Sequence, residues 1–230
     1  MVIGQSHFFF DFINYSSVNL LYFIALRPVI IITMANLLYA LGAVFFLLNF
    51  SESPSTIATG GEKQSIVAIP ATEDKEFIPW TEERLLTWDD FQSKPQRRTE
   101  AVASTSTSLG LTYDLKSGVL SYDITCAFSK AKSWGTLKTD YILAHEQGHF
   151  DITEIYARKL HHALAAYKLK SRTYQQDIAR IYQQVVKEKE HLQHLYDNQS
   201  DHSRNKRVQA NWEEIIDALL SETRPYAAYP

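Results

Sequence analysis

The sequence predicts an α+β fold in which a small antiparallel sheet packs beside three helices. This prediction depends on three observations. Residues 109–128 alternate apolar and polar side chains on either side of a Lys-Ser-Gly turn, as a β-hairpin does. Three later stretches carry apolar residues at helical spacing. An uncharged apolar stretch at residues 29–50 comes before these elements, so the folded part follows an N-terminal membrane or signal segment.

The N-terminal region, residues 1–50, differs in composition from the rest of the chain. Residues 29–50 form a run of 22 without a charged side chain, which is long enough to cross a bilayer as a helix. Arg27 precedes this run and Glu52 follows it, so the positive-inside tendency places the N-terminus in the cytoplasm. The region is either an uncleaved membrane anchor or a signal sequence with an internal start at Met34. Both interpretations predict export to a periplasmic or other extracytoplasmic location.

Composition separates a linker from the folded domain. Residues 51–76 are rich in Ser, Thr, Gly, Pro and Ala and predict a flexible linker, so the domain is expected to span residues 77–230. The formal net charge is −3, and no basic run is interleaved with aromatic residues, which argues against a nucleic-acid partner. Cys126 is the single cysteine, so an intramolecular disulfide and a cysteine metal cluster are excluded.

The domain elements can be predicted in chain order. Residues 81–91 indicate a short helix or turn whose Trp88 and Phe91 anchor the core. The hairpin of residues 109–128 follows, with its turn at residues 116–118, and the Thr-rich residues 103–108 extend its first strand. Apolar spacing then predicts helices over about residues 140–170, 173–196 and 208–220. Thr139 or Asp140 is the expected N-cap of the first helix.

The first of these helices carries the motif H-E-x-x-H at His145, Glu146 and His149. Residues four apart lie on one helix face, so both imidazoles can bind one Zn²⁺, and the adjacent glutamate can deprotonate a water on the metal. The alternative is a pair of core histidines that only make hydrogen bonds. Gly148 lies inside the motif, where a glycine indicates either close packing against the helix or simple tolerance.

A catalytic zinc usually has a third protein ligand. Glu154 lies about 140° around the helix from His149, so it would reach the metal only across a helix break and is better placed to pair with Arg158. The third-ligand prediction is His202, in an expected loop at residues 196–203, with Glu154 as the alternative. His191 and His194 near the second helix end could also bind metal, and Asp197 and Asp201 beside the loop histidine could orient an imidazole.

Several segments resemble a bacterial family of uncharacterised exported proteins described as zinc-dependent proteases. They are LTWDDF at residues 86–91, Ser133-Trp134, HEQGHFDITEIYARKL at residues 145–160, the Tyr196-Asp197 to Asp201-His202 block, and Gln209 with Trp212. The resemblance covers roughly residues 77–222. It implies a zincin-like fold, a metal held by His145 and His149, Glu146 as general base and an important His202. Ser200 and Ser203 stand where the family pattern has Thr and Gly.

The sequence therefore predicts an exported or membrane-anchored zinc metallopeptidase. Zn²⁺ would be held by His145, His149 and His202, and Glu146 would activate a zinc-bound water to cleave a peptide or protein substrate. Tyr196 is a candidate for stabilising the oxyanion. Two other functions stay open: a non-catalytic envelope protein with a structural metal and a partner-binding hairpin, and a metal-dependent amidase.

Overall fold

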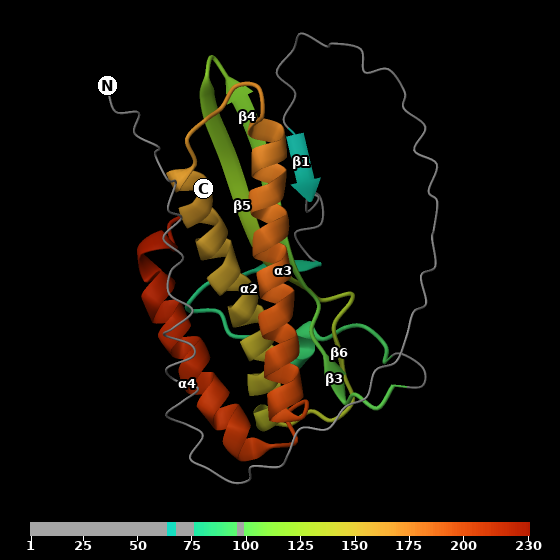
Figure 1. Cartoon of the computed structure of the whole chain (residues 1–230). Coiled ribbons are helices and arrows are strands. Elements are labelled where there is room, and N and C mark those ends of the chain that lie inside the picture. The colour runs from blue at the N-terminus through green and yellow to red at the C-terminus, as the bar shows by residue number, and fades with distance from the viewer. Residues whose placement is uncertain (1–63, 68–75, 96–98) are drawn as a thin grey trace, which may run out of the picture. The chain divides into compact units, whose positions relative to one another are not determined.

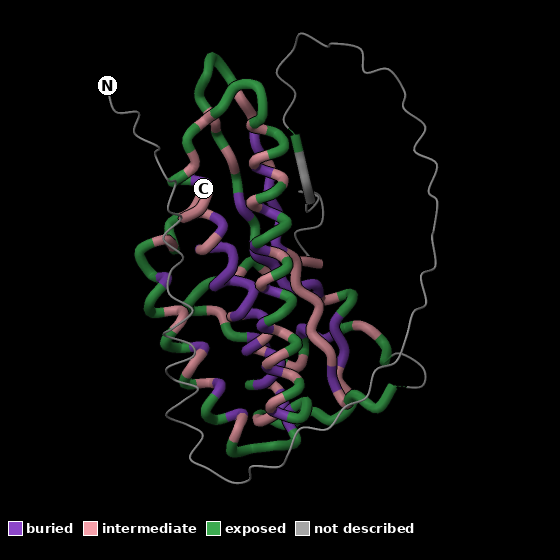
Figure 2. The backbone as a smooth tube through the Cα atoms, viewed as in Figure 1, coloured by how far each residue is buried: buried purple, intermediate pink, exposed green. Residues whose placement is uncertain are grey.

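Helix α2, Asp140–Ala166, is the central element of the fold, and the computed structural model describes it together with residues 64–67, 76–95 and 99–230. It packs against the main sheet, against α3 (Tyr174–Ser200) and against α4 (Lys206–Thr223) (Figure 1). Because it has neighbours on several sides, it is buried around most of its circumference, with Ile152, Ile155 and Leu160 fully buried (Figure 2). Thr139 is its N-cap, and the hydroxyl accepts the Ile142 N–H at 3.2 Å.

The main sheet has four antiparallel strands in the order β1-β4-β5-β2. They span Gln64–Val67 (β1), Phe77–Pro79 (β2), Thr107–Lys116 (β4) and Val119–Ser129 (β5). The predicted hairpin is confirmed as β4 and β5, which pair from Thr107↔Phe128 to Lys116↔Val119. Ser117 and Gly118 form its two-residue turn with φ of 50° and 79°, the left-handed pair that suits the twist of a hairpin. The strand β1 lies within the range that the sequence assigned to the linker.

A second sheet consists of two short strands, β3 (Ala103–Ser104) and β6 (Trp134–Gly135). The prediction that residues 103–108 extend the first hairpin strand is confirmed for residues 107–108, where β4 begins, and is wrong for residues 103–104, which pair with β6 as β3. Between β3 and β4 the chain leaves β6 and begins to pair with β5. At this point the Ser106 N–H donates to the Ser133 hydroxyl oxygen, and the Ser106 carbonyl oxygen accepts the Ser129 N–H. Of residues 81–91, Trp88–Asp90 form a 3₁₀ turn, η1.

The three predicted helices are confirmed, but their ends differ. Helix α2 stops at Ala166 instead of residue 170, because Tyr167 has extended backbone. Helix α4 runs two residues further at its start and three at its end than predicted, and a 3₁₀ turn, η2 (Arg224–Tyr226), follows it. The difference at α3 matters most for function: the helix continues to Ser200, four residues past its predicted end.

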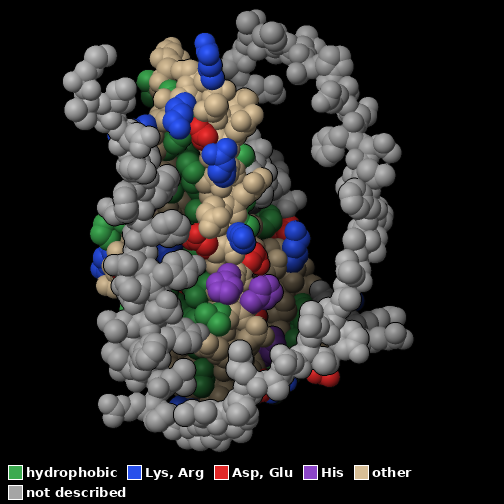
Figure 3. Space-filling view, viewed as in Figure 1, with side chains coloured by type: hydrophobic (Ala, Val, Ile, Leu, Met, Phe, Trp, Pro, Cys, Tyr) green, Lys and Arg blue, Asp and Glu red, His purple; other side chains and the backbone are tan. Residues whose placement is uncertain are grey.

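The predicted N-terminal region, with its apolar stretch at residues 29–50, lies outside the described residues. Within the described part of the chain, no helix is both long and apolar enough to cross a membrane. On the face shown in Figure 3, acidic, basic and histidine side chains are interspersed with hydrophobic and other side chains.

Candidate metal centre

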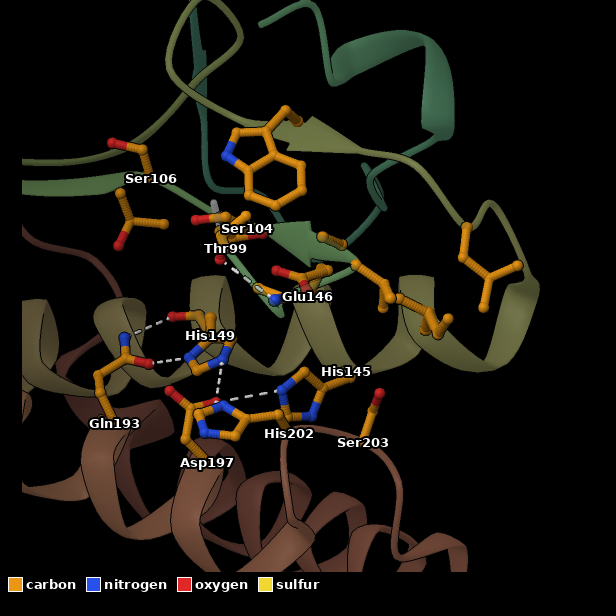
Figure 4. Close-up of a pocket in the computed structure, with 18 of the residues that line it drawn as sticks. Thr99, Ser104, Ser106, His145, Glu146, His149, Gln193, Asp197, His202 and Ser203 are labelled. Atoms are coloured by element: carbon orange, nitrogen blue, oxygen red, sulfur yellow. Dashed lines mark hydrogen bonds and ion pairs between the residues drawn. The ribbon is translucent and has the colours of Figure 1, made fainter. Parts of the chain in front are cut away.

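Three side chains from two helices converge on one point. His145 and His149 extend from the same face of α2, and Asp197 reaches them from the last turn of α3 (Figure 4). The Asp197 Oδ1 atom lies 2.9 Å from the His149 Nε2 atom and 3.2 Å from the His145 Nε2 atom. These ligand atoms all lie within 4.8 Å of one another. The i, i+4 spacing of the motif therefore brings its two imidazoles together as predicted.

Asp197 belongs to the group because α3 does not end where the polar run Asp-Asn-Gln-Ser suggests. Gln199 accepts the indole N–H of Trp212 at 3.0 Å, and the Ser200 hydroxyl donates to the Tyr196 carbonyl at 2.7 Å. The contact with Trp212 of α4 and the local bond within the last turn both accompany a helix that continues through residues of modest helix propensity. The prediction of a loop at residues 196–203 is wrong for its first five residues, and the left-handed turn is confined to residues 201–203.

The three groups interact strongly. Burial would raise the pKa of Asp197, but hydrogen bonds and charge interactions with His145 and His149 outweigh it and lower that pKa below its usual range. Burial would lower the pKa of His149, but Asp197, Glu146 and Gln193 together raise it. The carboxylate is therefore ionised at neutral pH and faces two nitrogen atoms that can exchange a proton for a metal ion.

Tyr196 explains the glycine inside the motif. A Cβ atom at Gly148 would lie 2.7 Å from the Tyr196 hydroxyl oxygen, so the prediction of close packing is confirmed, with α3 as the neighbour. The Tyr196 ring stacks on the His145 ring at 4.5 Å between centroids, and its hydroxyl donates to the His145 carbonyl oxygen at 3.4 Å. Tyr196 is fully buried, so it supports the histidine from behind, which does not match the oxyanion role expected from the sequence.

The other predicted ligands lie elsewhere. Glu154 is fully paired away from the site: Arg158 Nε donates to it at 2.8 Å, which confirms the predicted pair, and the Tyr229 hydroxyl donates at 2.7 Å. His202 is exposed at the mouth of the cleft, with its Nδ1 atom 3.7 Å from Asp197 Oδ1, and it is outside the group of three. His191 and His194 are exposed on α3. His202 as a metal ligand stays a prediction.

The group opens into a cleft of about 1550 Å³. One wall is the segment of residues 99–107, which includes β3, and the floor is the motif face of α2. Glu146 lines the cleft next to the two histidines and is 5% exposed. In Figure 4 it lies on the same side of α2 as Ser104, and Asp197 lies on the opposite side of the imidazoles.

Strand β3 presents one backbone edge away from β6. The Val102 carbonyl oxygen accepts the Thr136 N–H at 2.8 Å, and Ser106 bonds in the same direction to Ser133 and Ser129. Because backbone groups alternate sides along a strand, the N–H and C=O groups of Ala103 and Thr105 point to the opposite edge. Ala103 and Thr105 both line the cleft, so this edge adjoins the metal group.

The donor set fits a metal ion. Two neutral imidazole nitrogens and one carboxylate oxygen match the ligands of catalytic Zn²⁺, and they also match the facial triad of Fe²⁺ enzymes. The Nδ1 atom of His145 is buried and has no hydrogen-bond partner among the described residues, so the ring is held by packing on Tyr196 and through Nε2. The arrangement can hold a metal ion with part of its coordination sphere facing the cleft.

An α+β domain with this group in an open cleft defines a candidate metal-binding protein. The chain belongs to the family described as "Bacterial protein of unknown function (DUF922)", which matches residues 68–204. The match includes β4, β5, α2, α3 and every residue of the group of three. No curated protein and no solved structure matches the chain.

Sequence reasoning missed two functional residues of α3. It treated Asp197 as a supporting residue for a loop histidine, and it did not single out Gln193 at all. Gln193 and Asp197 are four apart, so one helix face presents both to the motif once the helix is known to continue to Ser200. The sequence contained this spacing as a signal, but the predicted helix ended at residue 196 and so left Asp197 outside it.

Proposed function

We propose that this protein is an exported zinc-dependent metallopeptidase in which His145, His149 and Asp197 hold the metal and Glu146 is the general base. The observation that carries the proposal is the convergence of three ligand atoms beside a buried glutamate in an open cleft. A structural zinc has four protein ligands, whereas a catalytic zinc has three and leaves a position for water and substrate.

Glu146 has the position that general-base chemistry needs. It follows His145 directly in the helix and lines the same cleft, so its carboxylate can accept a proton from the attacking water and pass it to the leaving amine. Zinc, when bound, would polarise the scissile carbonyl and acidify the water. The half-exposed His202 at the cleft mouth is positioned to contact substrate.

An extended polypeptide is the substrate that this cleft suits. The edge of β3 that faces away from β6 would offer the backbone groups of Ala103, and Thr105 directly after the strand would continue this edge along the cleft. A peptide can add to such an edge as a further strand, with its backbone fixed in register and its scissile bond over the motif. Export is part of the proposal because of the apolar stretch at residues 29–50, and cell fractionation with an antibody to the folded domain tests it.

Metal analysis and peptide cleavage test the proposal together. The purified full-length protein, Glu146→Gln and His149→Ala are compared for zinc content and for cleavage of a library of quenched fluorescent peptides. We expect one zinc per chain in the wild type and in Glu146→Gln, cleavage only in the wild type, and loss of both in His149→Ala.

Two outcomes would contradict the proposal. Equal cleavage by the wild type and Glu146→Gln would show that Glu146 is not the general base. The second outcome is one zinc per chain without any cleavage, with X-ray absorption spectra of the zinc that show three imidazoles and a carboxylate. It would indicate His202 as a fourth ligand and favour the structural-metal function.

A further inference from the structure

The two imidazoles of the group are held in different ways. His145 is packed against Tyr196, and its Nδ1 atom has no partner among the described residues. His149 instead has its Nδ1 atom hydrogen-bonded to Gln193 Oε1. The same Gln193 amide donates through Nε2 to the His149 carbonyl oxygen at 2.9 Å, so one side chain contacts both the ring and the backbone of one histidine (Figure 4).

The backbone contact determines which way the amide faces. A carbonyl oxygen can only accept a hydrogen bond, so the group next to the His149 carbonyl must be the NH₂ of Gln193. The amide oxygen then faces the ring, and an amide oxygen can only accept. The hydrogen of this bond must therefore be on Nδ1 of His149, and in the neutral ring Nε2 keeps its lone pair.

A short hydrogen-bond chain connects this arrangement to the sheet. The Thr153 hydroxyl donates to the His149 carbonyl oxygen at 3.1 Å. Having used its hydrogen, the Thr153 oxygen accepts from Gln193 Nε2 at 3.3 Å and from the Thr107 hydroxyl at 2.7 Å. Thr107 is the first residue of β4, so an unbroken chain of hydrogen bonds, each with one donor and one acceptor, runs from the sheet to His149.

We propose that Gln193 is a positioning residue that fixes the ring orientation and the tautomer of His149, so that Nε2 is the atom that binds the metal. This inference depends on the metal site of the proposed function. The same face of α3 supplies Asp197 one turn later, so α3 contributes both a ligand and the group that orients another ligand. Partners that orient a ligating histidine typically change metal affinity by about 10- to 100-fold when they are removed.

Zinc affinity of full-length variants tests the positioning role. Gln193→Leu keeps the approximate volume of the side chain and removes both hydrogen bonds. Gln184→Leu is the matched control, since Gln184 is exposed on the same helix and bonds to Glu188 at 2.7 Å, away from the ligand group. With a competing chelator, we expect roughly 10- to 100-fold weaker zinc binding in Gln193→Leu and no change in Gln184→Leu.

A spectroscopic measurement on the wild type separates positioning from a general effect on folding. In zinc-loaded protein with ¹⁵N-labelled histidine, we expect His149 to bind through Nε2 and to show a slowly exchanging Nδ1–H that Gln193→Leu loses. Binding through Nδ1, or equal zinc affinity in Gln193→Leu and the wild type, would overturn the role of Gln193 and leave the peptidase proposal standing. A wild type that takes up no zinc would overturn the proposed function itself, and with it this inference.

Discussion

Each half of helix α2 takes part in a polar group built around one carboxylate, Asp197 of α3 beside the first half and Glu154 in the second, but the two groups differ in how their polar atoms are paired. In the second half, Glu154 accepts hydrogen bonds from Arg158 and Tyr229, and Arg158 also donates to the Leu220 carbonyl oxygen at 2.8 Å. In the first half, the Nε2 atoms of His145 and His149 converge on Asp197 Oδ1, and the group lines a cleft. Similar residues on one helix thus stabilise the fold at one end and form a candidate ligand site at the other.

The comparison shows why Asp197 joins the two histidines whereas Glu154, the alternative third ligand, does not. Glu154 is 2% exposed and has a partner for each oxygen, so the fold uses it as a buried ion pair. Asp197 has a side chain that is 26% exposed, and its Oδ1 is shared by two imidazoles. An acceptor atom shared by several potential metal ligands, and open to a cleft, indicates a binding site.

Removing the buried cation should give the largest effect. Arg158→Met would leave Glu154 buried without its cationic partner, and we expect a loss of about 3–5 kcal/mol in the free energy of unfolding. Denaturant titration measures it. Arg180→Met is the control, because the Arg180–Asp177 pair is exposed and should change stability by less than about 1 kcal/mol. A loss in Arg158→Met as small as in the control would show that the two clusters do not differ in this way.

Zinc should stabilise only through the first half of the helix. A metal that binds the folded state adds about 2.7 kcal/mol at a concentration 100 times its Kd. We expect this gain, measured as a rise in the unfolding temperature, in the wild type and in Arg158→Met. It should vanish in His145→Ala. A gain that persists in His145→Ala would place the bound zinc elsewhere.

The close approach of α3 to the motif should appear as a smaller loss. Gly148→Ala brings a methyl group against the Tyr196 hydroxyl, and overpacking of this kind costs about 1–3 kcal/mol, reduced by the better helix propensity of alanine. We expect a net loss of about 1 kcal/mol and weaker zinc binding. Adding Tyr196→Phe removes the nearest atom and should restore part of both. An unchanged zinc affinity in Gly148→Ala would separate the packing from the site.

The smallest change should be a gain at the loop that follows Asp197. Ser203 has φ of 70°, a conformation that costs a non-glycine residue about 1–2 kcal/mol. Ser203→Gly should raise stability by less than about 1 kcal/mol, because glycine also gives the unfolded chain more freedom. Ser203→Ala, which keeps the backbone strain, should show no gain. Destabilisation by the glycine would mean that the serine side chain contributes more than the strain costs.

Much of the fold could be predicted because it depends on local patterns. Strict alternation identified β4 and β5, and apolar spacing identified all three helices. Strands β3 and β6 have two residues each, too few to show a periodic pattern, so the second sheet could not be predicted from the sequence. The motif histidines were predictable because their spacing is within one helix.

The rest of the site depends on tertiary contacts that local patterns do not contain. Asp197 enters the group because α3 continues past a polar run, where Trp212 of α4 binds Gln199. The role of Gln193 depends on a backbone carbonyl 44 residues away in the chain. Gly148 indicated close packing against the helix, but the sequence did not show which residue packs there, and the structure identifies it as Tyr196.

The position of Asp197 near the end of α3 has a mechanical consequence. Helices α2 and α3 are joined covalently by residues 167–173, whereas His149 lies 17 residues before the end of α2, about 25 Å along the helix from that connection. The helix pair is thus hinged at one end and fastened by the ligand group at the other. The same end of the helix pair is also held by Gln193 and Tyr196, which contact the backbone of His149 and His145, so the candidate ligand group lies where α2 and α3 are joined by side-chain contacts far from their covalent connection.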